Sequence, residues 1–76
     1  MYLSFAAFMR SRTYRFNERL FESDMMYRAK TWKVHRREYL TWCEQQGLFN
    51  DYEQINEEVL TYEAKVLNMR GCVPRN

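Results

Sequence analysis

The sequence predicts an all-α fold, in which an antiparallel helical hairpin of about residues 24–46 and 51–70 is joined by an additional N-terminal helix. Two runs of apolar residues at helical spacing cover these ranges, and Gly47 and Gly71 end them, as glycine often does at a helix C-terminus. Only a short connection separates the runs, so the two helices are expected to lie antiparallel. At 76 residues the chain is expected to form a single small helical domain, residues 1–76.

The N-terminal segment allows two interpretations. In the first, the chain breaks between Asn17 and Asp24, where Asn17 or Ser23 caps a new helix, and the result is a three-helix bundle. In the second, residues 4–46 form one long helix that dimerises along its apolar stripe. We expect the break, because helices much longer than about 25 residues are unusual outside coiled coils.

The middle helix carries an apolar stripe that continues in phase from the N-terminal segment. Gly47 followed by Leu48 fits a C-terminal motif in which the second residue packs back on the helix. We expect the stripe to face the core. Its members lie within about a third of a turn of one another, and they are Phe21, Met25, Ala29, Trp32, Arg36, Tyr39, Leu40 and Cys43.

The third helix has the clearest pattern, a heptad stripe with alternating steps of four and three residues. Asn50 can cap the first turn while Glu53 bonds back to it, and Pro74 prevents the helix from restarting after Gly71. The stripe consists of Leu48, Tyr52, Ile55, Val59, Tyr62, Val66 and Met69.

A chain of this size buries so little surface that it usually needs an additional source of stability. A disulfide is not expected, because Cys43 and Cys72 lie near opposite ends of the hairpin, about 27 Å apart against at most about 7 Å for a bridge. Both are expected to be reduced thiols in a cytoplasmic protein. These cysteines and the single His35 cannot form a four-ligand metal shell, and no apolar run is long enough for a membrane span. Oligomerisation or a partner protein remains, and no cofactor is expected.

The sequence brings together no recognisable catalytic set. No Ser or Cys lies within one helical turn of His35, the only imidazole, although Glu38 could orient its ring. Glu57 and Glu58 are neighbours on a helix whose outer face must be solvated, and no glycine-rich loop exists to bind a nucleotide phosphate. We therefore expect a protein that is not an enzyme.

Basic and aromatic residues interleave in residues 28–42, a pattern that suggests nucleic-acid binding. Helical geometry weakens this interpretation, because Trp32 and Tyr39 lie on the stripe that should be buried. Pairing with the acidic third helix is also a sufficient reason for the charges. Nucleic-acid binding is therefore the alternative hypothesis, and its candidate residues are Lys30, Lys33, Arg36 and Arg37.

Further apolar residues recur at heptad spacing outside the predicted core, and they are Leu20, Tyr27 and Val34, then Phe8 and Tyr14, then Leu60 and Leu67. They either complete a compact three-helix core or form contact surfaces for another chain. For a contact surface, the candidate partner-binding residues belong to types that are common in interfaces or expected to be exposed. These candidates are Tyr14, Tyr27, Arg28, Val34 and Trp42.

The leading hypothesis is a protein-binding module that modulates or inhibits a macromolecule by occupying a surface on it. Size, aromatic and methionine content and the lack of a catalytic set are similar to those of the small accessory proteins with which bacteriophages bind and redirect host proteins. This is a similarity of type and not of motif. The expected partners are another protein, in a host or cellular complex, and a second copy of the chain in a homodimer.

Overall fold

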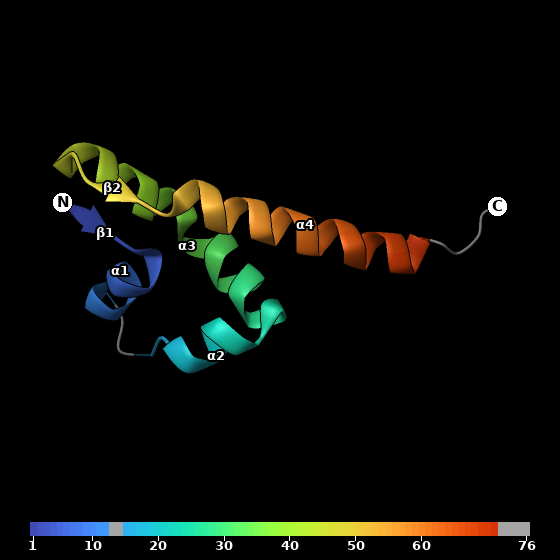
Figure 1. Cartoon of the computed structure of the whole chain (residues 1–76). Coiled ribbons are helices and arrows are strands. Elements are labelled where there is room, and N and C mark those ends of the chain that lie inside the picture. The colour runs from blue at the N-terminus through green and yellow to red at the C-terminus, as the bar shows by residue number, and fades with distance from the viewer. Residues whose placement is uncertain (13–14, 72–76) are drawn as a thin grey trace.

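The computed structural model describes residues 1–12 and 15–71, which are mostly helical (Figure 1). The all-α class is confirmed, with one addition that the sequence did not predict, a parallel ladder of two short strands. The two long helices occupy almost the same residues as those predicted at 24–46 and 51–70. The elements in chain order are β1 (Tyr2–Leu3), α1 (Phe5–Arg12), α2 (Glu18–Ser23), α3 (Met25–Gln46), β2 (Phe49–Asn50) and α4 (Tyr52–Gly71).

The N-terminal segment forms two short helices where one was expected. Asn17 caps α2, because its side chain accepts a hydrogen bond from the Leu20 N–H at 2.9 Å. Asp24, which has an extended backbone, caps α3 by accepting from the N–H groups of Met26 and Tyr27 at 2.9 and 3.2 Å. The break between Asn17 and Asp24 is thus present, whereas the alternative of one continuous helix over residues 4–46 is wrong.

Two details of this break differ from the prediction. Ser23 is not a cap: it is the last residue of α2, and its hydroxyl donates to the carbonyl of Arg19. The predicted three-helix count is wrong as well, because Asn17 and Asp24 are both extended and each starts a new helix. Asp24 also serves as the C-cap of α2, so that one residue separates α2 from α3.

The connection between α3 and α4 begins with the expected glycine. Gly47 has a φ of +65°, in the left-handed region that glycine adopts readily, and its N–H points to the carbonyl of Glu44 at 3.4 Å. The Leu48 N–H donates to the carbonyl of Cys43 at 2.9 Å, and the Leu48 side chain packs against the core. This is the predicted C-terminal motif, and it reverses the chain direction.

At the start of α4, Asn50 accepts a hydrogen bond from the Tyr52 N–H at 3.0 Å, as a capping side chain does. Glu53, which was expected to bond back to Asn50, is exposed. The helix α4 includes Gly71, which was expected to follow its last turn, and Cys72 and Pro74 lie outside the described residues.

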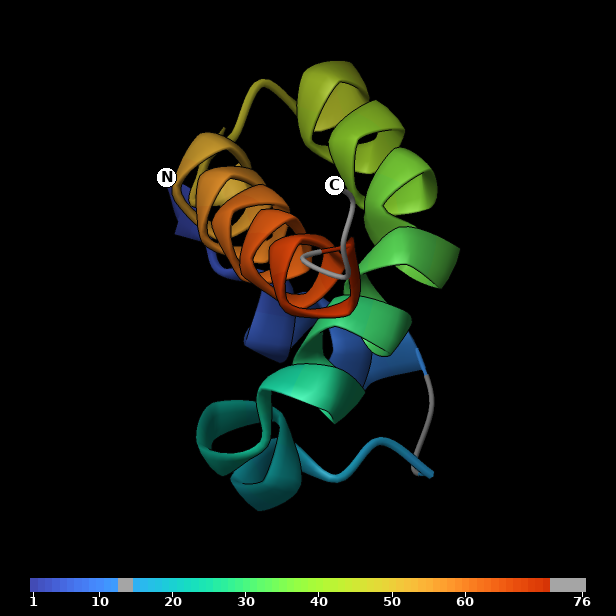
Figure 2. The same cartoon turned by 90° about the vertical axis from the view of Figure 1, so that its right-hand side faces the viewer.

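Side chains from all four helices meet in one core. Viewed along α4, α3 lies at its side and α1 and α2 lie beneath (Figure 2). Phe5 is fully buried at the centre, with its ring centroid 4.9 Å from that of Trp32, 5.2 Å from Tyr39 and 5.5 Å from Phe21. The buried residues of the core are Phe5, Phe8, Met9, Phe21, Ala29, Trp32, Tyr39, Cys43, Ile55 and Val59. The predicted stripe of α3 therefore faces the core.

The stripe of α4 is buried only over its first half. Ile55 and Val59 are buried, Val66 is half-buried, and Met69 is 76% exposed. The orange and red turns of α4 extend beyond the other elements (Figure 1). The heptad pattern of the sequence thus continues past the point where the rest of the described chain covers the helix.

A polar cluster, formed by Tyr39 and Asp51, ties three segments together inside the fold. Asp51 Oδ1 accepts from the Phe5 N–H at 3.0 Å and lies 2.7 Å from the Tyr39 hydroxyl. The same hydroxyl lies 2.6 Å from the carbonyl oxygen of Leu3 and accepts from the Asp51 N–H at 3.2 Å. Burial, together with the hydrogen bond to Asp51, raises the pKa of Tyr39 above its ordinary value of 10.0. Tyr39 therefore acts as a neutral structural group between β1, α3 and α4.

Candidate binding surface along helix α3

The imidazole of His35 and the thiol of Cys43 are both at least partly buried. His35 is half-buried on α3, and no group of three or more His, Cys, Asp or Glu side chains within this part of the chain could hold a metal ion. Burial raises the pKa of the Cys43 thiol, which disfavours the reactive thiolate. The candidate site therefore has to be sought among exposed side chains.

Two of the residues proposed for partner binding are engaged within the molecule. The Tyr27 hydroxyl oxygen accepts from the Asn17 N–H at 3.0 Å. Arg28 bonds to Glu58 at 2.7 Å and to the carbonyl of Phe21 at 3.2 Å, and its guanidinium carbon lies 4.5 Å from the centre of the Phe21 ring. These contacts join α2 and α4 to α3. Tyr14, a third proposed residue, lies outside the described residues.

The other two proposed partner-binding residues are exposed and line the same hollow. Val34 is 71% exposed and Trp42 is 36% exposed, on the outer side of α3. Arg37, proposed as a nucleic-acid contact, and Arg12, from the last turn of α1, line this hollow too. The structure thus brings together residues from two separate hypotheses and adds an arginine that the sequence analysis did not single out.

Arg12 is positioned by two aromatic rings. Its guanidinium carbon lies 4.8 Å from the centre of the Trp42 ring and 5.1 Å from the centre of the Phe8 ring. Both distances are within the range of a cation–π interaction. Phe8 is only 1% exposed and belongs to the core, so the arrangement connects an exposed cation to a rigid support. The guanidinium of Arg12 is exposed and forms no hydrogen bond or ion pair with a side chain of another described residue.

The four basic residues proposed for nucleic-acid binding divide into two pairs. Lys33 forms an ion pair with Glu63 at 2.8 Å, and Arg36 is half-buried with Nη1 donating to Asn56 Oδ1 at 3.1 Å. Lys30 and Arg37 are exposed and form no ion pair with a described residue. Contacts with α4 therefore occupy half of the predicted basic set.

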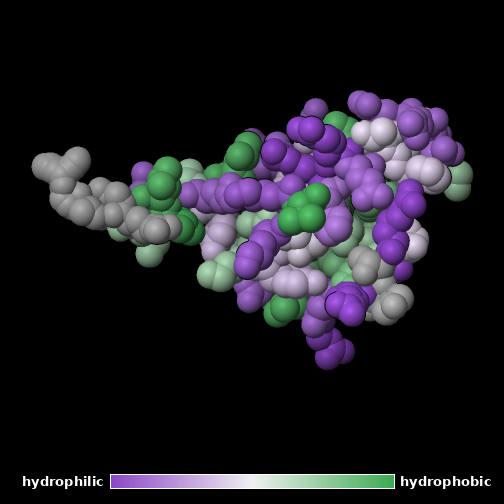
Figure 3. Space-filling view, turned by 180° about the vertical axis from the view of Figure 1, so that it is seen from behind, coloured by the Kyte–Doolittle hydropathy of each residue, from purple (hydrophilic) through white to green (hydrophobic). Residues whose placement is uncertain are grey.

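A groove between α3 and α4 continues the hollow toward the N-terminal end of α3. Met26 borders the groove from α3 and Leu67 borders it from the projecting part of α4, with exposed fractions of 67% and 68%. Lys30 and Lys33 lie at its edge, and Val34 lines both the groove and the hollow. Seen from behind, hydrophobic groups are set among hydrophilic ones, with several where α4 projects (Figure 3).

We use the name α3 face for this continuous surface. It runs over about 24 Å, the length of the 16 residue steps between its first and last helical members. Sequence analysis identified most of these residues but not Arg12 and Met26, because Arg12 joins the surface only through the packing of α1 beside Trp42. The α3 face consists of Met26, Lys30, Val34, Arg37 and Trp42, together with Arg12 from α1.

None of the helices in the described part of the chain combines the length and apolar character that crossing a bilayer requires. Comparisons of the chain with protein-family models, curated proteins and solved structures find no match.

Proposed function

We propose that the protein is a protein-binding module without enzymatic activity and that it binds its partner through the α3 face. One observation carries the proposal: Met26, Val34 and Trp42 are exposed along one helix, beside cations that have no ion-pair partner among the described residues. Single exposed apolar residues are ordinary, but a contiguous apolar patch bordered by polar residues is typical of an interaction site.

The residue types support an interface with another protein. Trp and Arg are the types that most often dominate the binding energy of protein interfaces, and Met is also enriched there. Trp42 and Arg12 are in contact, and their mutual packing limits the conformational freedom that would be lost on binding. The length of the face suits a helix of about four turns lying along it.

Nucleic-acid binding remains the second candidate, because Arg12, Lys30 and Arg37 share one side of the molecule. Two observations place it second. Glu63 already neutralises Lys33, and Glu38 lines the same hollow as Arg12 and Arg37. A phosphate backbone, by contrast, is usually bound by many cations without interspersed carboxylates.

The proposal extends to the kind of partner and to self-association. By occupying a surface on a host or cellular macromolecule, the module would modulate or inhibit it. The homodimer form of the proposal uses a second exposed stripe on the projecting part of α4, which consists of Leu60, Ala64 and Leu67. Light scattering gives the mass in solution, and Leu67→Asp reduces it to that of a monomer if this stripe joins two copies.

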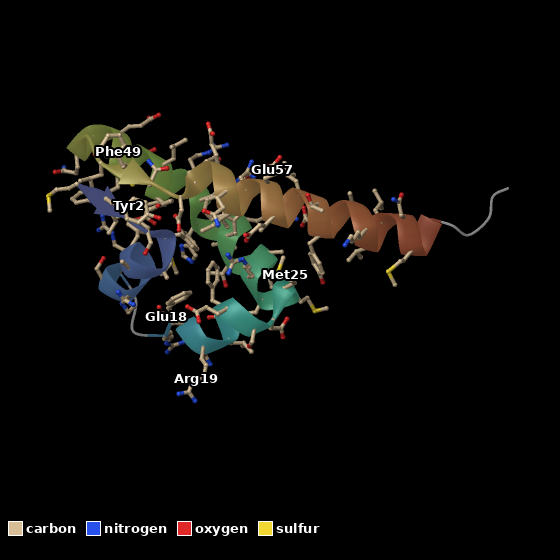
Figure 4. The ribbon with its side chains drawn as sticks, viewed as in Figure 1. Tyr2, Glu18, Arg19, Met25, Phe49 and Glu57 are labelled. Carbon is tan, nitrogen blue, oxygen red and sulfur yellow. The ribbon has the colours of Figure 1, made fainter. Side chains whose placement is uncertain are left out.

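Affinity capture from the native lysate, with and without nuclease, tests the main proposal. We compare the wild type with Val34→Asp, which places a charge in the middle of the α3 face without entering the core. Phe49→Asp is the matched control, since Phe49 is 75% exposed but lies in the β1–β2 ladder beside Tyr2 (Figure 4). We expect a stoichiometric protein that survives nuclease and is lost only with Val34→Asp. Capture that nuclease abolishes would favour the nucleic-acid alternative.

A further inference from the structure

We infer that Arg12 and Arg37 form a carboxylate-binding site for an acidic amphipathic helix of the partner, whose apolar side covers Val34 and Trp42. This inference rests on the proposed function and specifies the chemistry of the partner. The starting observation is the hollow that α1 and α3 form together, with two arginines, one tryptophan and one valine among its lining residues.

The side chain of Arg12 is already restricted before a ligand binds. A free arginine side chain loses considerable conformational entropy when it binds a ligand, and contacts that already restrict it reduce this cost. The rings of Phe8 and Trp42, at 5.1 and 4.8 Å, restrict the guanidinium of Arg12 in this way. A guanidinium that stacks on an aromatic ring keeps N–H groups at its edge, which is the edge that binds a carboxylate with two parallel hydrogen bonds.

The described side chains that line the hollow carry more positive than negative charge. Among the described residues, Arg12, Arg37 and Glu38 are the ionisable side chains that line the hollow, so the formal charges of these three, +1, +1 and −1, sum to +1. One additional carboxylate would neutralise the hollow. A polyanion such as a nucleic acid would place further phosphates near Glu38 and Glu63, where they meet like charge.

Apolar side chains extend from the hollow along the α3–α4 groove. Val34 is 71% exposed and lies between the hollow and the α3–α4 groove, while Met26 and Leu67 lie at the far end of that groove. A helix with apolar residues at heptad spacing would cover these side chains in succession. Lys30, at the edge of the groove, would face acidic residues on the flank of the same helix. The required ligand is therefore apolar on one side and acidic on its flank.

Two synthetic helical peptides of about 16 residues test the inference, a length at which an isolated helix can form. Both carry leucines at heptad spacing, one has glutamates on its flank, and the other has glutamines at those positions. Binding is measured by fluorescence anisotropy to the wild type, Arg12→Gln and Arg12→Lys. Arg19→Gln is the control, because it removes the same charge from an exposed residue on α2 that points away from the body (Figure 4). Circular dichroism verifies that each variant is folded.

We expect the wild type to bind the glutamate peptide about tenfold more tightly than the glutamine peptide, the ratio typical of one charge-assisted hydrogen-bonded pair. Arg12→Gln reduces this ratio to about twofold or less, Arg12→Lys gives an intermediate ratio, and Arg19→Gln preserves it. A ratio unchanged by Arg12→Gln, or no binding of either peptide, overturns the inference. So does an oligonucleotide that displaces the peptide and itself loses affinity in Arg12→Gln.

The native partner separates this inference from the function on which it depends. Capture that is lost with Val34→Asp but complete with Arg12→Gln leaves the protein-binding function intact and refutes the carboxylate site. If Val34→Asp and Arg12→Gln both lower capture and Arg19→Gln does not, the result supports the protein-binding function as well as the carboxylate site. A partner that binds all variants equally refutes the use of the α3 face altogether.

Discussion

Replacing Asp51 with alanine removes the acceptor that joins the start of α1 to the start of α4. The carboxylate accepts from the Phe5 N–H at 3.0 Å and from the Tyr39 hydroxyl at 2.7 Å. The hydroxyl has one proton, which either the carboxylate or the carbonyl of Leu3, 2.6 Å away, can accept, so it still has an acceptor in the variant. The N–H of Phe5 lies at the start of a helix, where no carbonyl of the same helix can accept its hydrogen bond. Phe5 is also fully buried, so water does not replace Asp51 as the acceptor.

The expected cost follows from this difference. A buried donor left without a partner costs about 1–3 kcal/mol, and the lost hydrogen bonds to a charged group add to it, so Asp51→Ala should destabilise the fold by about 2–4 kcal/mol. Tyr39→Phe leaves Asp51 bonded to the Phe5 N–H and should cost about 1–2 kcal/mol. A domain of this length has a free energy of unfolding of only about 4–11 kcal/mol, so the first substitution removes a large share.

Urea unfolding followed by circular dichroism measures these values. With a denaturant dependence near 1 kcal/mol per M, as small domains show, Asp51→Ala lowers the unfolding midpoint by about 2 M or more. Glu53→Ala is the control, because it removes an exposed carboxylate from the first turn of the same helix and should change stability by about 0.5 kcal/mol or less. Equal effects of Asp51→Ala and Glu53→Ala would show that the polar cluster does not stabilise the fold.

Three further predictions concern the core, the turn and the response to alkali. Val59→Asp should unfold the domain, at a cost of several kcal/mol, because it places a charge at a position that is 2% exposed, whereas Glu57→Ala should leave the thermal midpoint unchanged. Gly47→Ala should cost about 1 kcal/mol in urea unfolding through its positive φ alone, since no atom of a described residue other than the two adjacent ones lies within 4 Å of the new methyl group; a larger cost would indicate a clash. The raised pKa of Tyr39 predicts stability that is complete below about pH 10 and falls by up to about 1.4 kcal/mol per pH unit as the pH rises further, because only the unfolded chain then ionises this group. Thermal melting across this pH range should show a smaller fall in stability for Tyr39→Phe than for the wild type. Part of the fall should remain in this variant, because burial also raises the pKa of Cys43. An identical fall in both proteins would contradict the assignment of the effect to Tyr39.

The sequence predicts the long helices well because their signals are local. Gly47 and the apolar spacing of α3 and α4 act within a few residues, and the structure keeps both. The division of the N-terminal segment is harder to predict. Ser23 and Asp24 are adjacent residues that can both cap a helix, and in the structure Asp24 caps α3 while Ser23 is the last residue of α2. The β1–β2 ladder depends on a contact between chain segments more than 40 residues apart, which no local pattern records.

In the candidate surface, too, some features follow from local sequence patterns and others depend on tertiary contacts. The periodicity of the sequence identifies Val34 as an apolar residue outside the core stripe, but it does not show whether another helix covers this residue. Among the basic residues, contacts with α4 determine which ones have a partner. Residues of α4 bind Arg28, Lys33 and Arg36 but not Lys30 and Arg37. All five are basic residues of one helix, and only the tertiary contacts distinguish structural from available charges.

The arrangement of α3 allows binding to be separated from folding. One side of this helix supplies Trp32 and Tyr39 to the core, both fully buried, while its opposite side carries Val34 at 71% exposure. A substitution at Trp32 must therefore change stability and binding together, whereas Val34→Asp leaves all core contacts in place. Because surface substitutions usually change stability by about 0.5 kcal/mol or less, a large loss of binding in Val34→Asp can be assigned to the surface itself. The same reasoning applies to Arg12, whose exposed guanidinium lies against the core residue Phe8. Substitutions at Val34 and Arg12 therefore test directly whether the protein recognises its partner through the α3 face.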